Sequence, residues 1–283
     1  MNAAINNTIA FQGVPGAYSN LSCRAAFPAM TALPCPSFED MFAAVHEGRA
    51  RLAMVPIENS VAGRVADIHH LLPDSGLHIV GEHFQRVNHQ LLAVKGAKLS
   101  DIKTAASHIQ ALSQCRNNLR ALGIKPVVHA DTAGAAADLA ARGDKTAAAI
   151  ASSLAAEIYQ LDVLKADLED APHNTTRFVV MAQEPIDPDL AKGTIITSFV
   201  FKVRSVPAAL YKALGGFATN GVNITKLESY MLDGHFSSTQ FYADIDGHPD
   251  QRAVRLALEE LSFFSREVRI LGVYPASKFR QQD

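Results

Sequence analysis

Polar side chains stand directly before a β-prone apolar run in the stretch HNTTRFVV, residues 173–180. Asn, Thr and Arg side chains donate hydrogen bonds that can bind carboxylates or stabilise an oxygen that leaves with negative charge. Because side chains alternate along a strand, Thr176 and Arg177 should point to opposite faces, so only one of them can face straight into a pocket. Taken alone, the stretch fits a ligand site and an edge-strand Arg in a surface salt bridge equally well.

Three further polar turns follow predicted strands. GVPGAYSN (13–20) follows TIAFQ, ENSVAGRV (58–65) follows LAMVPI, and QALSQC (110–115) follows TAASHI. Ligands of open α/β sheets bind outside the carboxyl ends of the strands, where helix N-termini offer free N–H groups. We therefore expect these turns to border one cleft. The start of the 176–182 strand reaches the same cleft if that strand runs antiparallel to the others.

Two of these turns also have plain structural explanations. Gly16 allows the backbone to approach a ligand closely, but a turn of this kind, taken by itself, more often only closes a strand–helix corner. Asn59 and Ser60 follow a buried run, where polar groups are costly unless a ligand, water or protein group bonds them. Ser60 would alternatively cap a helix that follows it.

The first two thirds of the chain predict a mixed fold. From Thr8 to about Gln183, short β-rich runs alternate with helical runs, which is typical of α/β sheets covered by helices on both faces. Ser37 is expected to cap the helix after it, and another helix is expected to run from a capping Asp131 to Gly143.

The remaining third has a different pattern. Residues 184–194, EPIDPDLAKGT, contain two prolines and four charges without periodicity and predict a linker. From Ile195 onward the order of elements is βαββαβ, which predicts a four-stranded sheet with two helices on one face. The first of these helices is expected to begin at a capping Ser205 and to end at Gly221.

Composition excludes several classes of function. The 283 residues are 48% hydrophobic and carry a net charge of −2, so no basic field is present for nucleic acid. The N-terminus has no signal pattern and no apolar run approaches the ~18 residues of a membrane span, which predicts a cytoplasmic protein without a membrane partner. The three cysteines are widely spaced and predict neither disulfides nor a zinc site. Nucleotide-binding and metal-binding motifs are absent, so no cofactor and no metal are expected.

The four polar motifs, taken together and in their order along the chain, resemble those of a known protein family. GVPGAYS (13–19), VPIENSVAGRV (55–65), SHIQALSQC (107–115) and NTTRFVV (174–180), followed by the βαββαβ unit, resemble the prephenate dehydratase family with its regulatory ACT domain. The resemblance implies a catalytic region over residues 1–183, made of two α/β lobes shaped like periplasmic binding proteins, with the second lobe at about 80–165. The linker then spans 184–194, and a ferredoxin-like ACT domain spans 195–283.

The family reaction removes water and CO₂ from prephenate to give phenylpyruvate, the penultimate step to L-phenylalanine, and needs no cofactor. The resemblance makes the Thr before Arg-Phe, here Thr176, the essential residue. A Thr hydroxyl is a weak acid, so we expect it to donate a hydrogen bond to the leaving oxygen. Arg177, or N–H groups of helices after Gly16 and Ser60, would neutralise the carboxylates.

The residues expected at the active site fall into two groups. The catalytic group is Thr176, Arg177, Asn59 and Ser60. The substrate-binding group is Gly16, Ala17, Tyr18, Glu58, Ser107, Gln110, Asn174, Thr175 and Phe178.

The resemblance also implies an L-phenylalanine effector site in the ACT domain, at a domain interface. The residues expected there are Ala208, Ala209, Leu210, Asn223, Leu227, Glu228 and Ser229. Two departures weaken this site: Ala208 replaces a family glycine, and Tyr230-Met231 replaces Arg-Pro. The domain is further expected to pair subunits into a homodimer or homotetramer.

Three alternatives stay open from the sequence. The substrate can be arogenate, the amino analogue of prephenate, since the motifs do not separate the two. A non-catalytic sensor of an aromatic metabolite would keep the cleft without needing the Thr176 hydroxyl. A hydrolase with a Ser or Thr nucleophile is the weakest alternative, because the adjacent Ser107 and His108 diverge on an extended segment.

Overall fold

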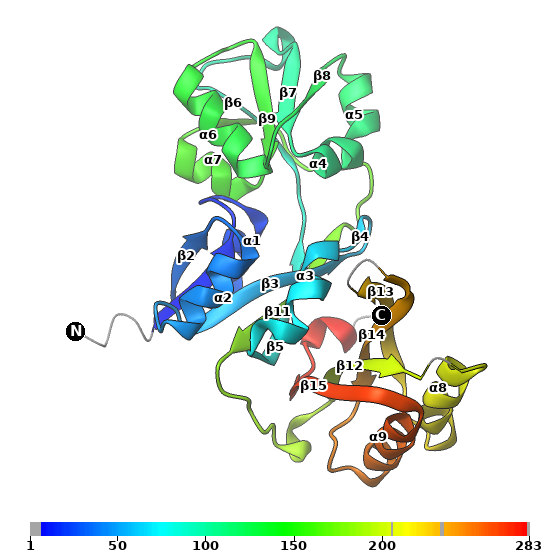
Figure 1. Cartoon of the computed structure of the whole chain (residues 1–283). Helices are drawn as coiled ribbons and strands as arrows, with labels where there is room; N and C mark the ends of the chain where they lie inside the picture. Colours follow the sequence, from blue (N-terminus) through cyan, green and yellow to red (C-terminus); the bar gives the residue numbers. More distant parts are fainter. Residues whose placement is uncertain (1–6, 205, 233–234, 282–283) are drawn as a thin grey trace. The chain divides into compact units, whose positions relative to one another are not determined.

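The structure is a computed structural model that describes residues 7–204, 206–232 and 235–281. Its backbone contacts divide the chain into two compact units. The first contains residues up to Val65 together with His83–Phe178, and the second contains Ala66–Glu82 together with the residues from Val179 onward. Figure 1 labels the helices and strands of both units.

The first sheet carries the N-terminal part of the chain. Its strands lie in the order β2 (Thr31–Cys35), β1 (Thr8–Gln12), β3 (Leu52–Asn59), β11 (Thr175–Ala182) and β5 (His78–Arg86), and β4 (Gly63–Arg64) pairs with β3. Strand β1 is parallel to both of its neighbours. The helices α1 (Tyr18–Ala26) and α2 (Phe38–His46) follow β1 and β2.

The second sheet carries residues 90–165. Its strands lie in the order β10 (Asp162–Lys165), β6 (Gln90–Ala93), β9 (Ala147–Ala151), β7 (Thr104–Ser107) and β8 (Lys125–Val128). Its helices are α4 (Ile109–Gln114), α5 (Arg116–Ala121), α6 (Thr132–Arg142) and α7 (Ser153–Tyr159).

Helices cover both faces of this second sheet. Leu91 packs in the core beneath α4 and α5, and its neighbour Leu92 packs in the core beneath α6 and α7. Ile150 and Ala151 of β9 divide between the two cores in the same way. Two sheets of this kind confirm the predicted α/β class with two lobes.

The predicted helix caps are confirmed. Ser37 Oγ accepts a hydrogen bond from Asp40 N at 3.0 Å, and Asp131 Oδ1 accepts one from Gly134 N at 2.6 Å. Gly143 ends α6 with φ at 67°.

The prediction of a helix directly after Ser60 is wrong. Asn59 Oδ1 accepts hydrogen bonds from Val61 N at 2.9 Å and Ala62 N at 2.7 Å, which closes a tight turn. The chain then returns as β4, in which Gly63 pairs with Asn59. No helix N-terminus therefore follows Ser60, and α3 (Ala66–Leu71) starts only after the hairpin.

The second unit contains the βαββαβ element order that was predicted. Its antiparallel sheet has the order β13 (Ile224–Leu232), β14 (His235–Asp246), β12 (Ile195–Val203) and β15 (Ser265–Pro275), with helices α8 (Ala209–Thr219) and α9 (Arg252–Phe264). Phe199, Phe217 and Leu261 lie in the core between the sheet and the helices. Short 3₁₀ turns occupy Pro73–Ser75, Leu99–Asp101, Leu190–Lys192 and Lys278–Gln281.

The predicted start of α8 is wrong. Ser205 lies outside the described residues, and the residue before the helix is Ala208, with a left-handed φ of 61°. That conformation cannot continue a right-handed helix, so α8 begins only at Ala209.

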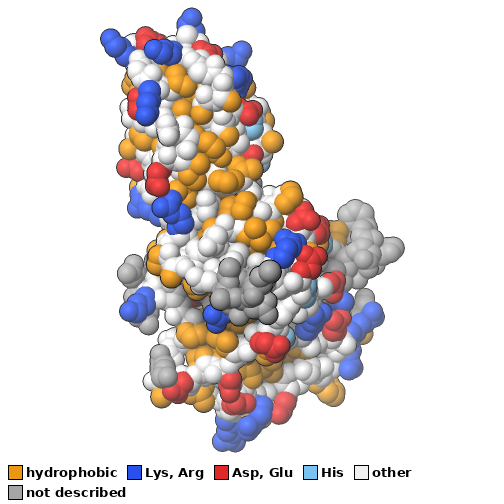
Figure 2. All heavy atoms as spheres, turned by 90° about the vertical axis from the view of Figure 1, so that its left-hand side faces the viewer, with side chains coloured by type: hydrophobic (Ala, Val, Ile, Leu, Met, Phe, Trp, Pro, Cys, Tyr) orange, Lys and Arg blue, Asp and Glu red, His pale blue; other side chains and the backbone are white. Residues whose placement is uncertain are grey.

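The surface carries charges of both signs. On the face in Figure 2, Lys and Arg side chains alternate with Asp and Glu and form no continuous basic area. Among the helices of the described ranges, none is both long and apolar enough to cross a membrane.

A close backbone contact joins the two sheets of the first unit. Gly16 has φ at 90°, and a Cβ placed there would lie 2.9 Å from Ala155 Cα in α7. Ser152 Oγ donates to Gly16 O at 2.6 Å, and Tyr159 OH donates to Pro15 O at 2.8 Å. The glycine predicted to admit a ligand thus admits helix α7 of the other lobe.

We expect Gly16→Ala to destabilise the fold more than Gly48→Ala. Gly48 also has positive φ, at 71°, but nothing lies within 4 Å of a Cβ there. The control substitution should cost about 1–2 kcal/mol for backbone conformation alone. Gly16→Ala adds overpacking and should cost about 2–5 kcal/mol in total. Denaturant unfolding measures both, and equal losses would contradict the close docking of α7.

Candidate functional site

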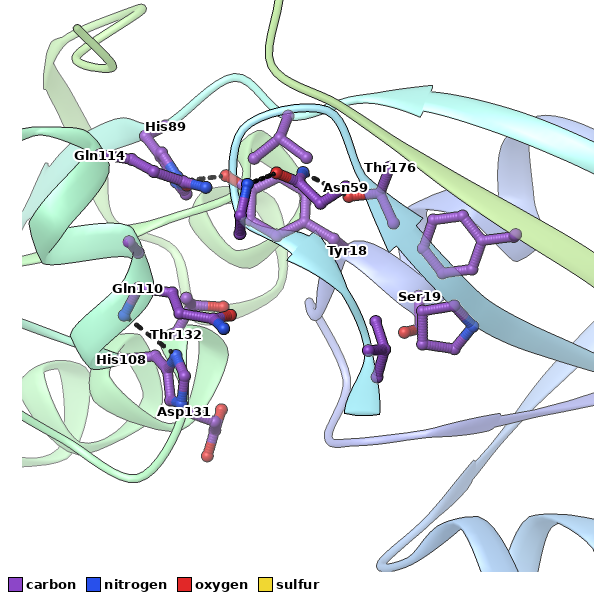
Figure 3. Close-up of a pocket in the computed structure, with 16 residues that line it drawn as sticks. Tyr18, Ser19, Asn59, His89, His108, Gln110, Gln114, Asp131, Thr132 and Thr176 are labelled. Carbon is purple, nitrogen blue, oxygen red and sulfur yellow. Dashed lines mark hydrogen bonds between the residues drawn. The ribbon is translucent and has the colours of Figure 1, made fainter. Parts of the chain in front are cut away.

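A pocket with a volume of about 250 Å³ lies in the first unit. Side chains from both of its lobes line the pocket, as Figure 3 shows. The polar lining residues are Tyr18, Ser19, Asn59, His89, His108, Gln110, Gln114, Asp131, Thr132 and Thr176.

The orientation of Asn59 is fixed by its backbone surroundings. Its Oδ1 accepts the two N–H groups of the turn that precedes β4, so its Nδ2 must point the other way. Nδ2 donates to Thr176 Oγ1 at 3.0 Å and to Asn174 Oδ1 at 2.8 Å. Thr176 Oγ1 accepts this bond and donates none within the described ranges, so its hydroxyl proton is available for a group in the pocket (Figure 3).

The chain of hydrogen bonds continues away from Asn59. Asn174 is 1% exposed, and its Nδ2 donates to Gln114 Oε1 at 3.1 Å. Gln114 Oε1 also lies 2.8 Å from His89 Nε2. With its oxygen engaged twice, Gln114 has only its amide N–H groups to offer the pocket that it lines.

The other face of the same two strands holds an ion pair. Arg177 NH1 lies 3.0 Å from Glu58 Oε1, and the Arg177 side chain is only 3% exposed. As strand alternation predicts, Thr176 lines the pocket and Arg177 does not. Arg177 and Glu58 therefore support the wall behind Asn59 and Thr176.

Burial sets the electrostatics around His89. The ring is 2% exposed, and its Nδ1 lies 2.9 Å from the Tyr18 hydroxyl. Desolvation lowers the pKa of His89 and raises the pKa of Tyr18, so both groups are neutral near pH 7.

The opposite wall is formed around the N-termini of α4 and α6, two helices that pack on the second sheet. His108 precedes α4, Gln110 and Gln114 lie one turn apart on it, and Asp131 caps α6 (Figure 3). None of the lining residues that the structure describes is Lys or Arg.

Free N–H groups supply the positive potential instead. Helix α1 begins at Tyr18 without a side-chain cap, and Tyr18 and Ser19 both line the pocket. An uncapped helix N-terminus binds anions through its N–H groups and its dipole. The pocket is therefore suited to an anion held by neutral donors.

The residues expected at the active site are not all at the pocket wall. Tyr18, Asn59, Gln110, Thr176 and Phe178 line it. Those that lie behind the wall or beside it are Gly16, Ala17, Glu58, Ser60, Ser107, Asn174, Thr175 and Arg177.

Two of the predicted hydroxyl groups are engaged within the protein. Ser60 Oγ donates to His173 O at 2.7 Å and accepts from Thr175 N at 3.0 Å, which ties β3 to β11. Ser107 is fully buried and donates to Ile150 O at 2.6 Å.

Sequence reasoning missed His89, Gln114 and the pocket position of Asp131. Gln114 follows Gln110 by four residues, a spacing that places both on one helix face. Asp131 comes just after a predicted strand but was interpreted only as a helix cap. His89 carries no local signal, because it lies between two strands in no recognised motif.

The expected effector residues separate into two places in the second unit. Ala208, Ala209 and Leu210 border a cavity of about 570 Å³. Asn223 donates to Asp246 at 2.8 Å, and the others lie on β13, an edge strand, outside the lining of this cavity. The residues on β13 are Leu227, Glu228 and Ser229.

Metal ligands do not gather at the site. Within residues 7–204, 206–232 and 235–281, no three His, Cys, Asp or Glu side chains are grouped so as to hold an ion.

Comparison with known proteins gives a consistent set of relatives. A family model described as prephenate dehydratase matches residues 9–186. The chain is 54% identical over 274 residues to the bifunctional N-acyl-homoserine lactone acylase/prephenate dehydratase of Komagataeibacter europaeus, covering 97% of this chain and 98% of that protein. It is 40% identical over 282 residues to arogenate dehydratase 2 of Petunia hybrida, covering 95% of this chain and 71% of that protein.

A solved structure of a prephenate dehydratase also aligns with almost the whole chain. The prephenate dehydratase of Arthrobacter aurescens, in complex with L-Phe, aligns with a TM-score of 0.85 at 32% identity. The alignment covers 95% of this chain and 89% of that one.

We expect Asn59→Asp to lower the free energy of unfolding by about 1–3 kcal/mol, since both Nδ2 donor bonds are lost and a carboxylate faces two oxygens. Asn7→Asp is the control, because Asn7 is exposed and its side chain donates to one backbone oxygen among the described residues, Ala29 O. The control should change stability by less than about 0.5 kcal/mol. Chemical denaturation measures both. Equal stability of the two variants would contradict the proposed orientation of Asn59.

Proposed function

The chain belongs to the prephenate dehydratase family, and on that premise we propose that it converts prephenate to phenylpyruvate in the synthesis of L-phenylalanine. The observation that carries the proposal is the Thr176 hydroxyl. It lines the pocket, accepts from Asn59 and keeps its proton for a ligand.

The reaction requires two bonds to break. The C–O bond breaks with its electrons on oxygen, and the bond to the ring carboxylate breaks with its electrons entering the ring. One proton is taken up, and CO₂ and water leave as the ring becomes aromatic. Thr176 donates a hydrogen bond to the departing oxygen, as one positioned donor worth roughly 2.7–4 kcal/mol of barrier.

The remaining groups bind and orient the substrate. We assign the carboxylates to the N–H groups at the start of α1 and to the amide groups of Gln110 and Gln114. Arg177 acts from behind the wall through Glu58, and Ser60 holds the start of β11. The Gln114 amide and the N–H groups at the start of α1 are held by the fold before the substrate arrives, so they need little reorganisation during the reaction.

Arogenate is the second candidate substrate. The pocket wall carries the Asp131 carboxylate and, among its described residues, no Lys or Arg. Asp131 Oδ1 caps α6, and its Oδ2 makes no hydrogen bond within the described ranges. A carboxylate beside the pocket favours the ammonium group of arogenate over the keto group of prephenate. Relatives named arogenate dehydratases support the same alternative.

The second unit is proposed to regulate the enzyme. We propose the division into a catalytic region (1–183), a linker (184–194) and an ACT domain (195–283) that binds L-phenylalanine. The structure of the A. aurescens relative in complex with L-Phe supports this effector. The edge strand β13 and Phe263, 66% exposed, suit pairing with a second copy. A site split between two copies would account for effector residues that lie apart within one chain.

The bifunctional relative raises acyl-bond hydrolysis as a further outcome to test. Both ring nitrogens of His89 bond to Tyr18 and Gln114, and Ser107 donates to a backbone oxygen. Neither is therefore placed as a base or a nucleophile. Turnover of an N-acyl-homoserine lactone with covalent labelling of a hydroxyl would support the hydrolase alternative, and binding of phenylalanine without any turnover would support the sensor.

We expect Thr176→Val to lower kcat for prephenate by roughly 10²- to 10³-fold, the usual effect of removing one donor to a developing oxyanion. Thr176→Ser keeps the hydroxyl and should retain most of the activity. Phenylpyruvate formation measures both variants. Unaltered turnover in Thr176→Val would refute the central assignment.

We expect Asp131→Asn to discriminate the two substrates. Asn caps a helix as well as Asp does, so the fold is preserved while the charge is removed. Loss of a charge-assisted bond should reduce kcat/KM for arogenate by roughly 10- to 100-fold and leave prephenate unaffected. An unchanged ratio between the substrates would remove the support for arogenate.

A further inference from the structure

The hydrogen bonds around the pocket have a defined direction. The two backbone N–H groups on Asn59 Oδ1 cannot reverse, so Asn59 must donate through Nδ2. Asn174 Oδ1 then accepts, and Asn174 Nδ2 must donate to Gln114 Oε1. Each amide orientation follows from the one before it.

This direction determines the hydrogen position on His89. Gln114 presents an oxygen to His89 Nε2 at 2.8 Å, so Nε2 has to carry a hydrogen. A neutral ring protonated on Nδ1 instead would place two acceptors against each other at that distance. In the neutral ring, Nδ1 is consequently an acceptor.

Tyr18 meets that requirement from the other side. Its hydroxyl lies 2.9 Å from both His89 Nδ1 and Asn88 O. Asn88 O also accepts from Gln90 Nε2 at 3.2 Å, so it stays bonded when Tyr18 donates to the ring. The single hydroxyl proton of Tyr18 therefore lies between two acceptors at equal distance, His89 Nδ1 and Asn88 O, and is shared by both.

The backbone of His89 is held in place as firmly as its ring. Glu169 is 8% exposed and accepts from His89 N at 2.8 Å, while His89 O accepts from Leu168 N at 2.8 Å. His89 has bonds on both ring nitrogens, on its N–H and on its carbonyl. Such a residue can transmit a fixed geometry to its neighbours.

We propose that His89 is a positioning residue of the dehydratase site. Neutral and protonated on Nε2, it fixes the Gln114 amide, and through Asn174 it reinforces the orientation of Asn59 and the Thr176 hydroxyl. This inference rests on the proposed dehydratase function. It assigns His89 no proton transfer, since amide groups separate it from Thr176.

The test compares His89→Asn with His89→Gln. The Asn side chain reaches about as far as Nδ1 and cannot bond to Gln114, whereas the Gln side chain reaches about as far as Nε2 and can donate there. His89→Asn should lower kcat by roughly 10- to 100-fold with KM changed by less than about threefold. His89→Gln should keep kcat within about threefold of the wild-type value. Equal kcat losses in both variants, or a KM increase with unchanged kcat, would overturn the proposal.

A second measurement does not depend on activity. Two-bond ¹H–¹⁵N correlation spectra of the full chain distinguish the two neutral tautomers of histidine, and the His89 signal is the one absent from His89→Gln. We expect a neutral ring with hydrogen on Nε2 at neutral pH; a ring protonated on Nδ1 would refute the hydrogen-bond chain. Wild-type protein that converts neither prephenate nor arogenate would refute the proposed function. The tautomer of His89 would still decide whether the series of hydrogen bonds from Asn59 to His89 exists.

Discussion

The geometry of the site depends on two backbone N–H groups, those of Val61 and Ala62, that bind Asn59 Oδ1. A side-chain amide can usually rotate by half a turn and exchange its oxygen and nitrogen. Here rotation would place an NH₂ group against two N–H donors, which excludes it. The tight turn after β3 therefore fixes the direction in which the amides of Asn59, Asn174 and Gln114 are oriented. As a result, Asn59 presents its NH₂ group, and not its oxygen, to the Thr176 hydroxyl.

This arrangement makes a pocket suited to an anion, although none of its described lining residues is Lys or Arg. Arg177 is the nearest candidate by sequence, but it is paired with Glu58 on the far face of the strands. A lysine or arginine in the pocket would bind the substrate and the transition state alike. In the proposed reaction, neutral donors aimed at the leaving oxygen would stabilise the charge that develops there, and such a differential effect is what lowers a barrier.

Local physics made much of the fold predictable from the sequence. Apolar periodicity and capping residues such as Ser37 and Asp131 fixed the helices, because these signals act within one or two turns. The βαββαβ order was predictable for the same reason. Strands β6 and β10 were not predicted, since no glycine or proline separates either of them from the element before it.

The candidate site was predictable only in part. Strand alternation was enough to separate Thr176 from Arg177, since it depends on adjacent residues alone. The bond from Asn59 to Thr176 spans 117 residues and depends on which strands become neighbours. The role of His89 could not be predicted from the sequence, because it depends entirely on such long-range partners, Tyr18 and Gln114 among them.

The glycine of the first polar turn shows how lobe docking and site geometry depend on one residue. Gly16 admits α7 at backbone distance, and one residue further on Ala17 leads into the uncapped start of α1 at the pocket. Ser152 caps α7 through Ala155 N and donates to Gly16 O with the same hydroxyl. The N–H groups assigned to the substrate carboxylate on one lobe, and the amide donors of α4 on the other, are thereby held at a set separation. Any side chain at position 16 would displace α7, so the spacing between the two sets of donors depends on the absence of a Cβ atom there. A larger residue at this position would alter the orientation of the substrate without touching it.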